Sequence, residues 1–187
     1  MDQNFTKLAF TSSVKKVQEE FSSRKHYSRL EKSGDRFVLS PNEISFIEAR
    51  DSFYLSSVGE ESWPYIQHRG GPKGFLKVIN NTSLAMADFS GNAQYISTGN
   101  IISNNKTMLF LMDYPSKSRL KIWATSKIVK ADENPELLAC LEDKQYGAKI
   151  ERIIVFTIKA FDWNCTQHIT QRFTKVEFEM LMLKQTF

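Results

Sequence analysis

Cysteine and histidine are scarce in this chain of 187 residues, which has two cysteines and three histidines. Cys140 and Cys165 cannot build a disulfide framework, and reduced thiols suit them better. Cys165 and His168 form a lone C-x-x-H pattern, but a zinc site needs about four ligands. The low histidine count leaves no second cluster to supply them. We therefore expect neither a disulfide-stabilised fold nor a metal site.

Long apolar runs are also missing. No window reaches the roughly 18 consecutive apolar residues that a membrane-spanning helix needs. The first 21 residues mix Asp, Lys, Gln and Glu and contain no apolar core of a secretory signal. The remaining composition, 41% hydrophobic and 25% charged, is ordinary for a globular protein. These features predict a cytoplasmic protein with a single domain that can bury a real core.

Several catalytic signatures are absent as well. The chain shows no Ser-His-Asp order, no H-E-x-x-H and no paired-carboxylate motif, so hydrolysis has little support. The glycine-rich segment at 67–74 is not a Walker loop, because no G-K-[ST] follows it. It is not a dinucleotide fingerprint either, because no helix is expected after the glycines.

Positive charge is in moderate excess, with a net charge of +4 and a pI of about 9.0. The clearest basic cluster comprises Arg24, Lys25, His26, Arg29, Lys32 and Arg36, with Glu31 and Asp35 interspersed. Such a cluster indicates either a solvated helix face or attraction to nucleic acid. No motif of stacking aromatics accompanies it, which favours the solvated face. A basic balance also suits a small anionic ligand.

Apolar periodicity predicts helices at both ends of the chain. Residues 11–32 have apolar side chains at helical spacing, and the sequence Ser40-Pro41-Asn42-Glu43 is a capping box that opens a helix to about Arg50. A second capping box, Thr174 to Glu177, begins a C-terminal helix. Shorter helices are expected near residues 97 and 138. The domain 1–187 then divides into a helical extension (1–40), a barrel (41–172) and a C-terminal helix (173–187).

Seven strands are expected between these helices. They span residues 53–58, 64–68, 75–79, 83–89, 107–113, 120–130 and 153–161. Because most connections are short, the strands should pair antiparallel, and closing or splitting the sheet into a barrel removes exposed edges. Strands and helices do not alternate along the chain, so the sequence does not indicate a doubly wound sheet. The fold class predicted is mainly β (α+β), an antiparallel split β-barrel with peripheral helices.

The first candidate binding segment is a corner at 67–74, rich in glycine and proline. Glycine lets a ligand approach the backbone closely. Arg69, Lys73 and the nearby Lys77 offer charge-assisted donors to a phosphate. An ordinary glycine-rich hairpin would have the same sequence, and His68 alone would more often be a structural histidine.

The second candidate segment, 90–100, turns through Ser-Gly-Asn and then begins a short helix. A helix N-terminus offers unpaired N–H groups and a partial positive charge. Ser97, Thr98 and Asn100 add hydroxyl and amide groups. Capping and turn chemistry would explain the same residues without a ligand.

Two later segments add charges and an aromatic ring. Arg119 and Lys121 should share one face of a strand. Their two positive charges either face a ligand or are simply exposed to solvent. Trp163, at a strand end before Arg172, could stack on a flat ring or belong to the core.

Taken in order, these segments resemble a known family. The runs Q-H-R-G-G-P-x-G-F-L-K-V, D-F-x-G-N-x-Q-Y-I-S-T-G-N, F-L-M-D-Y-P and F-D-W-N-C-x-Q-H-I are similar to the flavin-nucleotide-binding relatives of pyridoxamine 5'-phosphate oxidase. The resemblance covers roughly residues 43–172. It implies a split barrel that binds FMN at the subunit interface of a homodimer.

The resemblance also implies a set of cofactor-binding residues. Lys77, Asp88 and Phe89 would border the flavin, and Asn92 is where the oxidases have a phosphate-binding arginine. Arg119 is near their flavin-contacting glutamine, while Trp163 and Arg172 resemble residues that reach the flavin from the other subunit. The full set is Gln67, His68, Arg69, Lys73, Phe75, Lys77, Asp88, Phe89, Asn92, Ser97, Thr98, Arg119, Trp163 and Arg172.

The chain departs from the family at position 93, where Ala93 replaces a usually basic residue. Either the phosphate contact then comes from Arg69, Lys73, Lys77, Arg119 or the hydroxyls of Ser97 and Thr98, or the phosphate is bound more weakly. The oxidase's substrate-phosphate residues are not recognisable, so oxidation of pyridoxamine phosphate is not implied.

The sequence thus predicts a cytoplasmic FMN-binding homodimer, with flavin-dependent oxidoreductase activity as the leading function. It identifies no catalytic residue, substrate or electron donor. One alternative is a flavin- or haem-binding module without turnover, with His68 or His168 as an axial ligand. The other is a basic barrel that binds nucleic acid.

Overall fold

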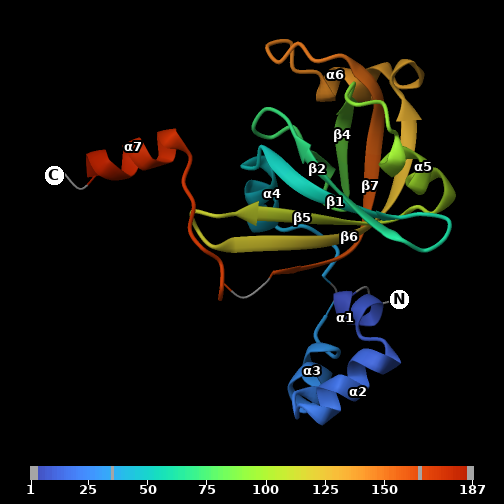
Figure 1. Ribbon diagram of the computed structural model, residues 1–187, viewed down its shortest axis with the longest axis vertical. Helices are drawn as coiled ribbons and strands as arrows, with labels where there is room; N and C mark the ends of the chain where they lie inside the picture. Colours follow the sequence, from blue (N-terminus) through green and yellow to red (C-terminus); the bar gives the residue numbers. More distant parts are fainter. Residues whose placement is uncertain (1–3, 35, 164–165, 185–187) are drawn as a thin grey trace.

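A seven-stranded antiparallel sheet forms the body of the protein in a computed structural model that describes residues 4–34, 36–163 and 166–184 (Figure 1). The strand order is β2-β1-β5-β6-β7-β4-β3. The strands are β1 (Ser52–Val58), β2 (Pro64–Gly70), β3 (Lys77–Asn80), β4 (Ser83–Phe89), β5 (Lys106–Asp113), β6 (Ser118–Lys130) and β7 (Ile150–Trp163). The two longest strands, β6 and β7, lie at the middle of this order and join strands β2, β1 and β5 on one side to β4 and β3 on the other. A register shift between Trp123 and Ala124 interrupts the pairing of β6 with β7. The predicted split-barrel fold is confirmed.

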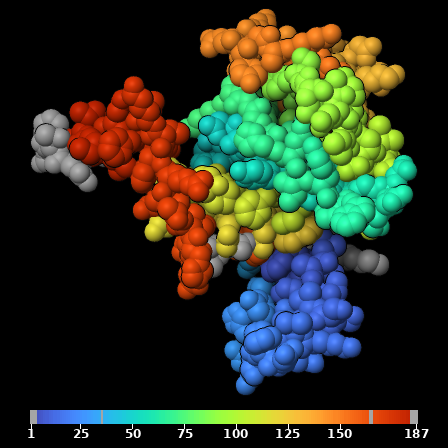
Figure 2. Space-filling model, viewed as in Figure 1, coloured from blue at the N-terminus to red at the C-terminus, as the bar shows by residue number. Residues whose placement is uncertain are grey.

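Helices surround the sheet rather than alternate with its strands. They are α1 (Phe5–Ala9), α2 (Ser12–Glu20), α3 (Arg24–Leu30), α4 (Pro41–Glu48), α5 (Ile96–Ser103), a 3-10 turn (Ala131–Glu133), α6 (Pro135–Leu141) and α7 (Lys175–Lys184). The blue helices α1 to α3 and the red helix α7 project from the barrel (Figure 2). No helix in the described ranges is long and apolar enough to cross a bilayer.

Alternating strand positions build the core. Leu55, Leu109 and Ile122 lie side by side in the register of β1, β5 and β6, and each is fully buried. Arg119 and Lys121 occupy the other face of β6, as the alternation predicts. A smaller cluster, which includes Ala87, Leu141 and Ile153, lies where α6 packs against β4.

The structure corrects the helix expected at 11–32. The chain breaks between α2 and α3 at Ser22, which has a left-handed φ of 57°. The apolar side chains at helical spacing in this segment are exposed: Val14 by 37%, Val17 by 53% and Phe21 by 73%. The spacing marks a helix, α2, but these apolar side chains remain accessible to solvent. The expected division of the chain into 1–40, 41–172 and 173–187 stays a prediction.

The glycine-rich corner is also shorter than expected. Strand β2 continues through Gln67 to Gly70, and only 71–76 forms the turn. Strand β3 begins at Lys77 rather than at Phe75, because Gly74 has a φ of +76° and the Phe75 N–H donates to the Pro72 carbonyl. Gln67 and Arg69 therefore belong to a strand, which fixes the side of the sheet on which their side chains lie, and not to the turn.

Candidate functional site

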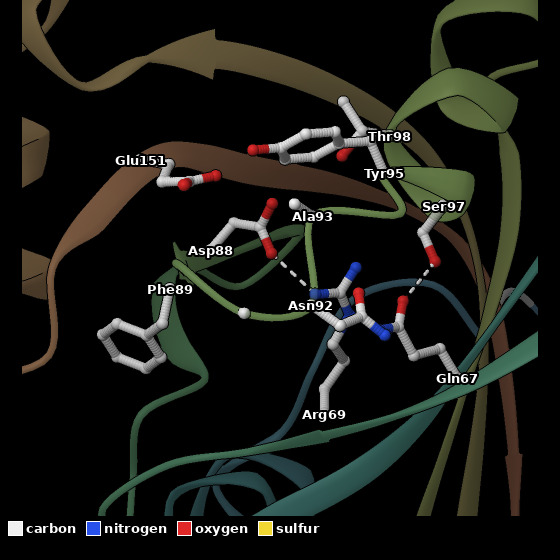
Figure 3. A pocket seen from close by; sticks show the side chains of 11 residues that line it. Gln67, Arg69, Asp88, Phe89, Asn92, Ala93, Tyr95, Ser97, Thr98 and Glu151 are labelled. Atoms are coloured by element: carbon white, nitrogen blue, oxygen red, sulfur yellow. Dashed lines mark hydrogen bonds and ion pairs between the residues drawn. The ribbon is translucent and has the colours of Figure 1, made fainter.

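A pocket of about 220 Å³ lies where β2, β4 and the first turn of α5 meet (Figure 3). Seven of the predicted cofactor-binding residues line it: Gln67, Arg69, Asp88, Phe89, Asn92, Ser97 and Thr98. Gly91, Ala93, Tyr95 and Glu151 complete the lining. The structure thus brings together the two segments, 67–74 and 90–100, that the sequence singled out separately.

Asp88 is the electrostatic centre of this pocket. It is 5% exposed, and its carboxylate accepts a hydrogen bond from Arg69 Nη1 at 2.6 Å. Arg152 Nε lies 3.5 Å from the other carboxylate oxygen. The Arg69 Nε atom is buried and has no hydrogen-bond partner among the described residues. A buried donor without a partner is costly, so a ligand oxygen at this position would satisfy it.

The N-terminus of α5 forms the opposite wall. Its N-cap residue, Tyr95, has a left-handed φ of 53°, and no described side chain caps the helix. The first helical hydrogen bond runs from the Gly99 N–H to the Tyr95 carbonyl, so the three preceding N–H groups lie outside the helical ladder. Ser97 Oγ donates to Gln67 Oε1 at 2.8 Å and ties this turn to β2. These groups favour an anion beside the turn.

The predicted cofactor-binding set lacks four residues that line the pocket, Gly91, Ala93, Tyr95 and Glu151, and also lacks Arg152, which contacts that lining. The Arg152 guanidinium lies 4.6 Å from the centre of the Tyr95 ring, donates to Thr98 Oγ1 at 3.4 Å and forms an ion pair with Glu151. Arg152 is paired with Asp88 in the register of β4 and β7. The sequence offered only one signal, an acidic-basic pair at the start of a long strand, and nothing in it fixes that register.

Three predicted residues lie in a different hollow. Lys73, Phe75 and Lys77 line a space of about 310 Å³ beside the end of α6, and Phe89 borders both this space and the pocket. Phe75 is 5% exposed and its ring stacks on Phe53 at 5.7 Å between centroids, so it is mainly a core residue. Of the lysines and arginines proposed for the phosphate, only Arg69 lines the pocket itself.

Arg119 and Arg172 lie together in a third hollow. This space of about 370 Å³ also contains His168, Phe110 and Met112 in its lining. Arg119 Nε is a second buried donor without a hydrogen-bond partner in the described chain, and Arg172 lies over the Tyr114 ring at 5.1 Å. Within one chain these cations line a different space from the pocket.

His68 and Lys121 also face away from the pocket. His68 alternates with Gln67 and Arg69 along β2, and its ring contacts Tyr54 edge-on at 5.7 Å. Lys121 Nζ pairs with Asp162 at 3.0 Å and lies near the Trp123 ring. Its charge is therefore already compensated within the chain.

Trp163 is anchored from within its own chain. Its Nε1 donates to Glu43 Oε1 at 2.7 Å, and its ring meets Phe46 edge-on at 4.7 Å. Burial disfavours ionisation of Glu43, but hydrogen bonds from Ser40 and the Trp163 indole outweigh it and hold the pKa of the carboxyl below its ordinary value. This environment matches the alternative prediction for Trp163, a core tryptophan.

No metal-binding group of three or more His, Cys, Asp and Glu side chains comes together in the portion of the chain that the structure describes. Cys165, half of the C-x-x-H pattern, lies outside the described residues.

Known proteins resemble this chain in their structures but not in their sequences. No family model and no curated protein matches the chain. Among solved structures, HupZ from Group A Streptococcus superposes with a TM-score of 0.52 at 12% identity, covering 72% of this chain and 100% of its own. A candidate pyridoxamine 5'-phosphate oxidase from Lactobacillus delbrueckii gives 0.51 at 17% identity, with coverages of 67% and 93%.

A third structure, General Stress Protein 26 from Bacillus anthracis, gives a TM-score of 0.50 at 12% identity and covers 65% of this chain and 91% of its own. At these identities the likeness concerns the fold. The resemblance inferred from the sequence motifs and the architecture of the sheet agree. The chain therefore has the split-barrel fold of pyridoxamine 5'-phosphate oxidase-like proteins.

Proposed function

We propose that this protein is a cytoplasmic homodimer that binds FMN and acts as a flavin-dependent oxidoreductase. The observation that supports it most is the pocket between β2, β4 and α5. There Arg69, whose Nε has no hydrogen-bond partner among the described residues, lines the same pocket as Tyr95, the N-cap of a helix that no described side chain caps. That combination suits a phosphate group.

The pocket would hold the phosphate end of the cofactor. Its volume of about 220 Å³ is below the roughly 300–1,000 Å³ of typical small-molecule pockets, so it suits part of a nucleotide better than all of it. Arg69, the hydroxyls of Ser97 and Thr98, and the first N–H groups of α5 would bind the phosphate. Asn92 would add an amide group.

A second copy of the chain would complete the site. Arg119 and Arg172 line another hollow, and Arg119 retains an unpartnered buried donor. A dimer could bring these cations to the flavin bound by the other protomer, which one chain alone does not do. Positive charge near the flavin ring would stabilise its anionic reduced form. The bound cofactor would supply the redox chemistry, while the protein supplies position and electrostatics.

Flavin titration tests the proposal directly. Purified protein should quench the fluorescence of added FMN, and the absorbance spectrum of material as purified should show a flavin. Steady reduction of the bound flavin by a nicotinamide donor would support the enzyme, and light scattering should give twice the chain mass of 21.6 kDa. A colourless protein that leaves FMN fluorescence unchanged would contradict the proposal.

Haem binding without turnover is the second candidate. His168 and Met112, two side-chain types that can be axial haem ligands, line the same hollow as Phe110. A Soret band that appears on titration with haem and disappears in His168→Ala would favour it. Titration without any Soret change would leave FMN as the only ligand proposed.

A further inference from the structure

Arg152 contacts four residues of the pocket lining without lining the pocket itself. Its guanidinium lies over Tyr95, donates to Thr98 Oγ1, forms an ion pair with Glu151 and lies 3.5 Å from Asp88. The side chain is only 16% exposed. A planar guanidinium has five donors in a fixed fork, so it can hold several acceptors in one arrangement.

These contacts join three elements. Asp88 is in β4, Arg152 is in β7, and Tyr95 and Thr98 belong to the first turn of α5. Tyr95 occupies a left-handed conformation, which is uncommon for a residue with a side chain. The Arg152 guanidinium lies 4.6 Å from the centre of the Tyr95 ring and donates to Thr98 Oγ1, so it contacts the turn of α5 at two points.

Arg152 also balances the charge of the cluster. Arg69 and Arg152 face Asp88 and Glu151, so these four groups have a net charge of zero. Without Arg152 the cluster would be negative by one unit and would repel a phosphate.

We propose that Arg152 is the positioning residue of this pocket: it holds the first turn of α5 against β4 and makes the pocket selective for a phosphate-bearing flavin. This inference rests on the proposed FMN site. Arg152 is absent from the set of phosphate contacts that the sequence predicts, and it acts through Thr98, Tyr95 and Asp88.

The test compares FMN with riboflavin, which has the same ring and no phosphate. Arg152→Gln should weaken FMN binding about tenfold, the equivalent of one lost charge-assisted interaction. Riboflavin affinity should change far less, so the FMN-to-riboflavin ratio falls. Arg152→Lys keeps the charge but cannot reach the same acceptors, and it should restore the ratio only in part. If Arg152→Gln does not fold, Arg152→Lys alone provides the test.

A double variant separates position from charge. Glu151→Gln combined with Arg152→Gln returns the cluster to zero net charge without the bridging guanidinium. We expect its FMN-to-riboflavin ratio to stay below that of the wild type. A double variant that regains the wild-type ratio would show that Arg152 acts by charge alone, which overturns the positioning role.

Arg50 offers a matched control. Its side chain is 17% exposed, pairs with Asp113 at 3.3 Å and lies 4.7 Å from the Phe46 ring centre. Arg50 therefore resembles Arg152 in exposure and in having a carboxylate and an aromatic ring as partners. Arg50→Gln should lower stability yet leave the FMN-to-riboflavin ratio unchanged. If the wild type binds FMN and Arg152→Gln keeps the ratio, this inference alone is wrong. If the wild type binds neither flavin, the proposed function is wrong and the inference falls with it.

Discussion

Arg69 and Asp88 form an ion pair of 2.6 Å between two strands that are not neighbours in the sheet. Arg69 is in β2, at one end of the strand order, and Asp88 is in β4, next to the other end. The pair therefore spans the opening of the split barrel, beside the proposed phosphate pocket. The same contact stabilises the fold and shapes the site.

Asp88→Asn should lower the free energy of unfolding by about 3 kcal/mol, because two partly buried guanidiniums lose their shared carboxylate. The same change makes the cluster positive by one unit. Inorganic phosphate should then raise the melting temperature of the variant more than that of the wild type. Asp113→Asn, which breaks the Arg50 pair, is the control. An equal phosphate effect in both variants would show that no anion binds at Asp88.

Trp163→Phe tests the hydrogen bond between the indole and Glu43. Phenylalanine can keep the contact with Phe46 but leaves the buried Glu43 oxygen without its donor. We expect a loss of about 1–3 kcal/mol in the free energy of unfolding near neutral pH. Urea unfolding measures it, and Trp123→Phe, which changes a tryptophan stacked on Phe5, is the comparison.

The same pair predicts a pH dependence. The pKa of Glu43 in the folded state is below its ordinary value of 4.5, so its contribution to stability is complete above about pH 4.5 and is lost as the pH falls through the lower folded value. Trp163→Phe removes one interaction that lowers this pKa. The stability difference between wild type and variant should therefore shrink on acidification. A constant difference from neutral pH to about pH 3 would show that Glu43 does not titrate in this way.

Gly74→Ala should destabilise the turn before β3. The position has a φ of +76°, and a Cβ there would lie 3.1 Å from the Glu48 carbonyl oxygen. A left-handed conformation costs roughly 1–2 kcal/mol for a residue with a side chain. Gly99→Ala, within α5 and with nothing inside 4 Å of the new Cβ, should instead be neutral or stabilising. Thermal melts of the two variants should shift in opposite directions or differ clearly in size.

Ala93→Arg should strengthen phosphate binding. Ala93 lines the pocket and is exposed, so a longer side chain needs no repacking of the core. The added guanidinium should raise FMN affinity about tenfold while leaving riboflavin affinity nearly unchanged. Ala93→Gln supplies similar length without charge and should have little effect. Weaker FMN binding by the arginine variant would place the phosphate elsewhere.

Local sequence signals predicted several elements closely. Strand β4 has the predicted bounds, Ser83–Phe89, and Leu120 and Ile122 are buried as their alternation indicated. Both capping boxes form: Ser40 with Glu43, and Thr174 with Glu177. These features depend on residues two to four positions apart, which the sequence displays directly.

Features that depend on distant contacts could not be predicted in the same way. The apolar spacing of Val14, Val17 and Phe21 is typical of a core-facing helix, yet all three are exposed, because which surface a helix meets is decided by the rest of the fold. The separation of Arg119 from the pocket likewise follows from the register of β5 and β6, not from its spacing along the chain.

The sequence by itself determined the number and approximate positions of the strands, the two capping boxes, the motif resemblance and most of the pocket's lining, because periodicity and turn chemistry act over a few residues. Only the tertiary structure decided that Arg69 meets Asp88 across the split, that Arg152 supports α5, and that Lys73, Lys77 and Arg119 lie elsewhere. Strand order and register set which side chains meet, and they arise from packing the whole sheet. No local spacing contains that information.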